Sequence, residues 1–199
     1  QPATQEIGEM AFQGELQVSP LPDWTLLFHQ SLIDDLNAAK LYRESLFESS
    51  IVKYNKYTLI SGVQLREYNQ EVYEGKPNAP IVRSITPYVD YIKQLNPKNS
   101  IRINGEYMIS RQAEGSWMNL LLEYSIAPKW IFTLSDMYNV KPVKGDKFNY
   151  YTGGATYIHN ANRFSVNWVR QRAGIVCTGG ICRYEPAFNG IKINLESRF

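Results

Sequence analysis

The sequence lacks both a long hydrophobic run and a large excess of charge. No segment approaches the roughly 18 consecutive apolar residues that a transmembrane helix needs, so we predict no such helix. The formal net charge is only +2 and is spread along the chain, which argues against nucleic-acid binding. The mean hydropathy of −0.35 is typical of soluble proteins. That inference fails for β-barrels, because half of every spanning strand faces a polar interior.

Metal-binding residues are scarce, with two cysteines and two histidines in 199 residues. His29 and His159 lie far from each other and from the cysteines in the sequence, so we predict no zinc site and no cofactor. Cys177 and Cys182 flank a Gly-Gly turn. This spacing favours a disulfide, which requires an oxidising compartment.

The sequence also lacks a recognisable catalytic constellation. His29 is followed by Ser31 and by an acidic pair at 34–35. A hydrolase would need a nucleophile, a base and an orienting group together, and we interpret His29 instead as a polar-face side chain beside an acidic loop. The glycine pair at 153–154 precedes no helix, so it does not predict a phosphate-binding loop. We therefore predict that the protein is not an enzyme.

The sequence does contain a clear pattern, in which apolar and polar residues alternate with a period of two. Tyrosine is common, with 14 residues, and aromatic residues make up 13% of the chain, which favours strands. The alternation is clear at 9–18, 24–29, 101–110, 118–126, 164–168 and 191–199, and weaker near 40–53, 57–71, 81–94, 130–139 and 148–158. We predict about eleven strands in one all-β domain spanning 1–199.

Short and long connections alternate along the chain. The short ones are 19–23, 54–56, 96–99, 127–129 and 160–162, and the longer ones are 34–39, 72–80, 112–116, 140–147 and 172–187. Outer-membrane barrels have this asymmetry, with tight periplasmic turns and larger external loops. The fold class we predict is an antiparallel up-and-down transmembrane β-barrel in a bacterial outer membrane, with its C-terminus in the periplasm.

Aromatic residues at the short-turn ends of strands support this orientation. Trp24, Tyr57, Trp130 and Phe199 would form an interfacial girdle in contact with the lipid bilayer. The terminal Phe199 also resembles the signal by which barrel-assembly machinery recognises its clients. Single-chain bacterial barrels have an even number of strands, and eleven is odd. We therefore expect the chain to be the C-terminal part of a longer barrel.

Several charged residues fall on the polar face, where we expect them to line the lumen: Arg102, Glu106, Glu123, Lys192, Glu196 and Arg198. Pairing across the connection at 112–116 would place Glu123 diagonally near Arg102 and Glu106. Opposite charges in a lumen usually pair for structural reasons. A selectivity constriction would use the same residue types, so both interpretations stay open.

The C-terminal segment carries a family resemblance. It contains two cysteines around Gly-Gly in Ile175-Val-Cys-Thr-Gly-Gly-Ile-Cys-Arg183, a Pro186-Ala187 step and the terminal Phe199. These residues resemble the C-terminus of Bacteroidota outer-membrane barrel proteins of unknown function, of the DUF6029 type. The specific part covers about the last thirty residues. The resemblance implies an outer-membrane location and a longer chain, and it supplies no activity and no catalytic residues.

Three functional hypotheses follow. The first is a non-enzymatic scaffold or accessory subunit that works with other outer-membrane proteins or lipoproteins, for example in secretion or barrel assembly. The second is a porin-like channel for small solutes or nutrients. The third is a soluble β-barrel or sandwich that binds a partner, with the apolar face turned inward. Alternation alone does not distinguish the inside of a barrel from the outside.

Overall fold

The computed structural model describes residues 8–143, 145–178 and 181–197, without the side chains of 175–183. Its strands are β1 (Glu9–Leu21), β2 (Trp24–Asp35), β3 (Lys40–Lys53), β4 (Tyr57–Asn69), β5 (Ile81–Asn96), β6 (Asn99–Ser110), β7 (Ser116–Ile126), β8 (Trp130–Lys141), β9 (Asn149–His159), β10 (Asn162–Gln171), β11 (Gly174–Thr178), β12 (Ile181–Glu185) and β13 (Phe188–Ser197). One short helix, α1 (Gln70–Glu74), follows β4.

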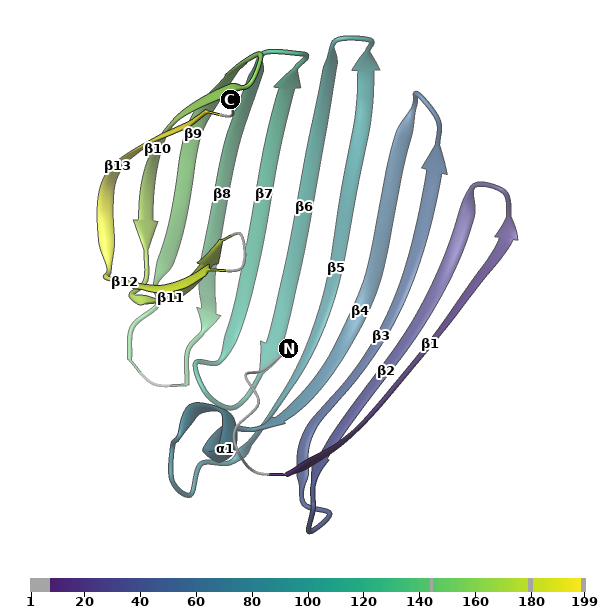
Figure 1. Cartoon of the computed structure of the whole chain (residues 1–199), viewed down its shortest axis with the longest axis vertical. Coiled ribbons are helices and arrows are strands. Elements are labelled where there is room, and N and C mark those ends of the chain that lie inside the picture. The colour runs from purple at the N-terminus through teal and green to yellow at the C-terminus, as the bar shows by residue number, and fades with distance from the viewer. Residues whose placement is uncertain (1–7, 144, 179–180, 198–199) are drawn as a thin grey trace.

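Eleven strands form a single antiparallel meander in the order β1 to β10 and then β13 (Figure 1). The hairpin of β11 and β12 forms a separate two-stranded sheet inserted before β13. The all-β antiparallel prediction and the eleven strands of the main sheet are confirmed. The predicted closure is not seen: in the described residues the sheet is open, with β1 and β13 as its two edges.

The two ends of the sheet differ as the loop pattern predicted. The short-turn end carries the connections 22–23, 54–56, 97–98, 127–129 and 160–161, and the long-loop end carries 36–39, 70–80, 111–115, 142–148 and 172–187. Asn55 and Asn160 have φ angles of 54° and 53° in two of the short turns. Asparagine tolerates this left-handed conformation better than most residues, so these turns can be tight.

The helix α1 was not predicted. The sequence pattern predicted a strand over 57–71, but the strand β4 ends at Asn69 and α1 follows it directly. The Asn69 side chain accepts hydrogen bonds from the amides of Glu71 and Val72, which is the usual N-cap arrangement. Gly75 ends the helix with a φ of 64°, a conformation that glycine adopts without steric cost. The two caps therefore delimit one helical turn at 70–74, where the sequence pattern predicted the end of a strand and the start of a loop.

The sheet has one apolar and one polar face. A single row of cross-strand neighbours on the apolar face runs Ile103, Leu122, Leu134, Gly153, Trp168 and Ile191. The next row on the opposite face includes Glu123 beside Thr133. Among the described hydrophobic residues, only Leu41 and Val82 are buried. The apolar face therefore has no packed protein core against it.

Candidate functional site

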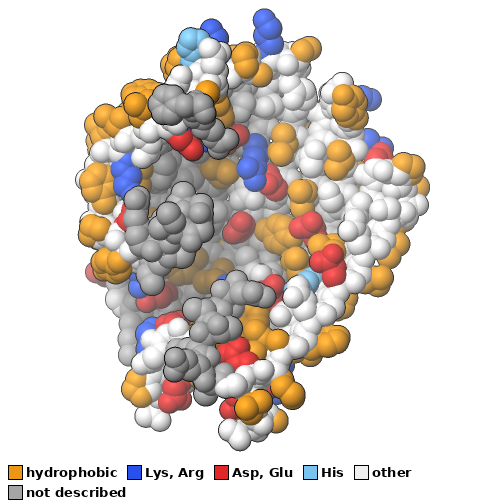
Figure 2. All heavy atoms as spheres, viewed as in Figure 1, with side chains coloured by type: hydrophobic (Ala, Val, Ile, Leu, Met, Phe, Trp, Pro, Cys, Tyr) orange, Lys and Arg blue, Asp and Glu red, His pale blue; other side chains and the backbone are white. Residues whose placement is uncertain are grey.

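The polar face is the concave one. Figure 2 shows acidic and basic side chains gathered in the hollow between the two edges of the sheet, with hydrophobic side chains along the outline. Tyr42 belongs to this polar face, and the Tyr73 ring of α1 packs edge-on against the Tyr42 ring with centroids 6.5 Å apart. The helix α1 therefore lies on the polar side of the sheet. Apolar side chains on the opposite, convex face are widely exposed: 60% for Leu134 and 63% for Ile191. A large exposed apolar surface marks a site of contact with lipid or another protein.

Aromatic side chains gather on the convex face at the short-turn end. Trp130 lies 4.8 Å from the Tyr157 ring, and Tyr57 lies 6.0 Å from the ring of Tyr91. Trp24 donates a hydrogen bond of 2.9 Å to the Ser49 hydroxyl, which satisfies its indole N–H. Three of the four predicted girdle residues therefore share one end and one face, and pairing across β-strands adds Tyr91 and Tyr157.

The fourth girdle residue, Phe199, lies outside the described residues, and so does the predicted lumen residue Arg198. The assembly signal assigned to Phe199 stays a prediction.

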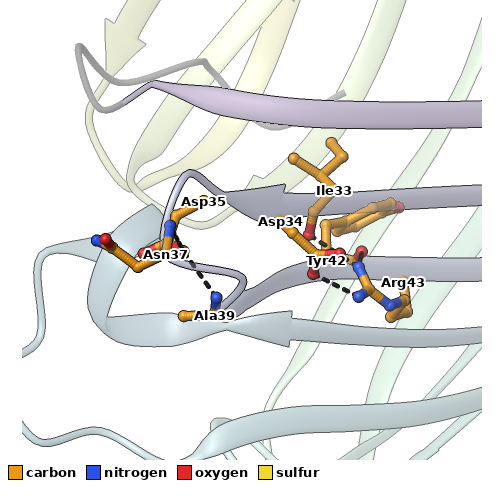
Figure 3. A network of polar contacts seen from close by, with 7 residues as sticks. All are labelled: Ile33, Asp34, Asp35, Asn37, Ala39, Tyr42 and Arg43. Atoms are coloured by element: carbon orange, nitrogen blue, oxygen red, sulfur yellow. Dashed lines mark hydrogen bonds and ion pairs between the residues drawn. The ribbon is translucent and has the colours of Figure 1, made fainter.

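Charged pairs border the convex apolar face at the long-loop end. Arg43 forms an ion pair with Asp34 and also donates to the carbonyl oxygens of Ile33 and Tyr42 (Figure 3). Arg83 pairs with Glu67 at 3.0 Å. The apolar surface is thus a band, bounded by ion pairs at one end of the strands and by aromatic rings at the other.

The predicted lumen residue Arg102 is paired, but not with the residue expected. Its guanidinium makes a two-pronged contact with Asp90, with Nε–Oδ1 at 2.9 Å and a second hydrogen bond of 2.5 Å to Oδ2. Glu123 stands directly opposite Arg102 in the register rather than diagonally, which corrects the prediction. Glu106 does not join this cluster, because its direct neighbours are Tyr88 and Asn119.

The predicted lumen residue Lys192 lies in a second polar cluster. Its ammonium contacts Glu185 at 2.8 Å and the Gln171 side-chain oxygen at 2.6 Å, and it stands 5.7 Å from the centre of the Phe188 ring. Glu196 is exposed and faces Arg163 across β10 and β13. The charges predicted to line one surface therefore divide into separate groups along the sheet.

His29 and the acidic pair at 34–35, which were considered as possible hydrolytic residues, form other contacts. His29 Nδ1 lies 3.8 Å from the Glu15 carboxylate. Asp34 binds Arg43, and Asp35 accepts hydrogen bonds from the amides of Asn37 and Ala39, which closes the β2–β3 turn (Figure 3). The two carboxylates near His29 in sequence are therefore engaged in structural contacts.

The cysteine hairpin forms as a backbone feature. Cys177 on β11 and Cys182 on β12 are direct cross-strand partners. Their side chains lie outside the described part of the structure, so the disulfide stays a prediction.

A groove opens on the concave face near the long-loop end. Two adjoining depressions of about 470 and 330 Å³ share Arg66, Met108, Trp117 and Arg172 in their walls. The Trp117 ring stacks on Tyr150 with centroids 5.9 Å apart, and Arg66 Nε is buried without a hydrogen-bond partner. The sequence pattern did not indicate this groove, because its residues come from strands far apart in the chain.

The α1 turn borders this groove through Glu74. The carboxylate accepts hydrogen bonds from Tyr68 at 2.6 Å and Gln70 at 2.9 Å, and pairs with Lys76 at 2.7 Å. Burial of the carboxylate raises its pKa, but the three donors outweigh that effect and lower the pKa of Glu74 to about 2. Glu74 is thus an ionised anchor for the helix at neutral pH.

These features define an all-β protein built on one open, curved, eleven-stranded antiparallel sheet, apolar on its convex face. In the described part of the chain, no helix is both long and apolar enough to cross a membrane. Residues 29–199 match the family of unknown function DUF6029, and the chain belongs to that family. No curated protein and no solved structure matches the chain.

Proposed function

We propose that this sheet is part of the wall of a β-barrel embedded in a bacterial outer membrane, where it acts as a non-enzymatic scaffold or accessory subunit. The observation that carries the proposal is the band of exposed apolar side chains on the convex face, bounded by aromatic rings at the short-turn end. Lipid covers such a surface without requiring a protein core. An inward-facing apolar core would require the opposite curvature, which disfavours the soluble alternative.

The open edges add a second argument. Side chains on the convex face of the edge strands are strongly exposed, at 63% for Phe12 on β1 and 65% for Ile193 on β13. Each unpaired backbone group in lipid costs several kcal/mol, so further strands must cover both edges. The strands β1 and β13 run in the same direction, because ten chain reversals separate them. An antiparallel closure therefore needs an odd number of additional strands, from this protein or from a partner.

A scaffold fits the concave face better than an open channel does. Two ion pairs lie on it, Arg102 with Asp90 and Lys192 with Glu185. The segment that follows β10 also reaches another connection of the long-loop end, because Arg172 contacts Glu114 of the 111–115 connection at 3.2 Å. Charges that neutralise one another in this way contribute little to selecting a solute by charge.

A porin-like channel is the second candidate, and the Trp117–Tyr150 groove with Arg66 favours it, because aromatic faces and guanidinium groups can hold a passing solute. Reproducible single-channel conductance from the purified protein in planar bilayers would support the channel. Its absence, together with co-purifying proteins after gentle extraction on native gels, would support the scaffold.

The edge strands give the sharpest test of the barrel. A photo-crosslinking amino acid at Gln13 on β1 should capture a neighbouring strand, which mass spectrometry would assign to this chain or to another protein. Gln64 on β4 is the matched control, since it also lies on the concave face but has Leu46 and Thr86 as its cross-strand neighbours. It should crosslink only within the described sheet. The absence of any strand beside Gln13 would contradict the proposal.

A further inference from the structure

The short-turn end of the sheet carries an excess of positive charge. Its turns and the adjoining strand ends hold five exposed lysines: Lys53, Lys56, Lys93, Lys98 and Lys129. The turns themselves contain one carboxylate, Asp23, which binds Lys53, and on the adjoining strand ends Glu196 faces Arg163 across β10 and β13. The other four form no ion pair with any residue that the structure describes, and we call them the rim lysines: Lys56, Lys93, Lys98 and Lys129. Figure 2 shows basic side chains projecting along this edge, at the top of the view.

The rim lysines stand beside the aromatic girdle. Lys56 precedes Tyr57 in the chain, and Lys129 precedes Trp130. Lys93 is the cross-strand partner of both Tyr57 and Ile101, which places it on the convex face. Lys98 lies in the turn between β5 and β6. Positive charge and aromatic rings therefore occupy the same border of the apolar band.

The long-loop end has no comparable excess. Four of its basic residues form ion pairs with nearby carboxylates: Arg43 with Asp34, Arg83 with Glu67, Lys76 with Glu74 and Arg172 with Glu114. Its other exposed basic residues form no ion pair with any residue that the structure describes, namely Lys40, Arg111, Lys141 and Lys147, but further carboxylates lie in or next to the same connections: Asp35, Glu71 and Asp146. The excess of positive over negative charge is thus at the short-turn border of the band.

We propose that the rim lysines bind the phosphate groups of anionic phospholipids in the leaflet at the short-turn end. This inference rests on the proposed function, because it requires the convex face to be in lipid. A lysine stem can run along apolar surface while its ammonium group reaches the headgroup region. Each lysine near an anionic surface increases lipid association by about fivefold at moderate ionic strength, and the attraction weakens in salt.

Tryptophan quenching provides the test. The protein, extracted with the strands that complete it, is placed in phosphatidylcholine nanodiscs containing a minor fraction of brominated lipid. Trp24, Trp130 and Trp168 lie on the convex face and report contact with lipid, whereas Trp117 lies on the concave face. Brominated phosphatidylglycerol should quench more than an equal fraction of brominated phosphatidylcholine, and high salt should reduce that difference.

Two charge-matched variants locate the effect. Replacing the four rim lysines by glutamine should make the two brominated lipids quench equally. The control replaces four exposed basic residues of the long-loop end by glutamine, namely Lys40, Arg111, Lys141 and Lys147, and should keep the preference for phosphatidylglycerol.

The outcomes separate the two proposals. Equal quenching by both lipids in the unmodified protein would overturn the lysine inference and leave the barrel proposal standing. A preference that survives in the rim variant, or that does not respond to salt, would also overturn the inference. Absence of quenching by either lipid would contradict the barrel itself.

Discussion

Tyr88 on β5 lies across Gly62 on β4 and donates its hydroxyl hydrogen to Glu48 on β3, over a distance of 2.6 Å. A Cβ atom built on Gly62 would stand 2.6 Å from Tyr88 Oη and 2.5 Å from the Phe47 carbonyl oxygen. The missing side chain of Gly62 therefore creates the space in which the ring bridges three strands. An aromatic ring covering a strand glycine also offsets the poor packing of that glycine.

The substitution Gly62→Ala should destabilise the sheet, because the new methyl group cannot avoid both the ring and the backbone oxygen. We expect a loss of about 1–3 kcal/mol in the free energy of unfolding, measured by denaturant titration in detergent or vesicles. Gly105 on β6 is the control, since the nearest atoms to its added Cβ are 3.9 Å away. A Gly62→Ala protein as stable as Gly105→Ala would show that the ring is free to move.

The Arg102–Asp90 pair should contribute more to stability than an exposed pair. The Asp90 side chain is 14% exposed, and Asp90→Asn would leave Arg102 with a weaker partner. We expect a loss of about 1–2 kcal/mol in unfolding free energy. The control is Glu114→Gln, because Glu114 and Arg172 are each more than half exposed and such pairs contribute little. Equal effects of the two substitutions would contradict the assignment.

Docking of α1 should depend on pH through Glu74. The pKa of this carboxyl is about 2 in the folded chain, below its ordinary value of 4.5. Its contribution is therefore fully present above pH 4.5 and is lost as the pH falls toward 2. A nitroxide label at Glu71 should become more mobile over that interval. In the Glu74→Gln variant the mobility of the label should not respond to pH there, and an unchanged response would exclude Glu74 as the cause.

A charge on the convex face should be costly if that face meets lipid. We expect Leu134→Arg to cost about 2–4 kcal/mol, and Ser135→Arg on the concave face to cost at most about 1 kcal/mol. The two residues are neighbours on β8 and point to opposite faces. Unfolding in vesicles measures both. A larger penalty at Ser135 than at Leu134 would reverse the assignment of the faces.

The strands could be predicted from the sequence because period-two alternation and loop length are local properties. The helix α1 was missed since five residues are too few to show helical periodicity, although Asn69 is a recognisable cap. The curvature of the sheet, the open edges and the groove beside Trp117 depend on contacts between distant strands. No local pattern encodes such contacts.

The strand register explains why the predicted partner of Arg102 was wrong. Across the turn at 97–98, Arg102 is the direct partner of Ile92, which leaves Asp90 as its diagonal neighbour. On its other side Arg102 is directly opposite Glu123, because the register of β6 and β7 runs without a shift from Met108–Trp117 to Asn99–Ile126. The diagonal position expected for Glu123 thus belongs to Asp90. The position of the connecting turn thus determines which residues of the next strand are direct neighbours and which are diagonal ones.

The most direct test of the barrel proposal is collision-based spin-label spectroscopy along β8. Single nitroxides at Phe132, Thr133, Leu134 and Ser135, in a chain whose native cysteines are replaced, would be exposed to oxygen and to a water-soluble nickel chelate in vesicles. We predict that oxygen, which concentrates in lipid, reaches labels at 132 and 134, whereas the chelate reaches those at 133 and 135. Labels at 132 and 134 that are reached by the chelate as readily as their neighbours would contradict a lipid-facing convex surface.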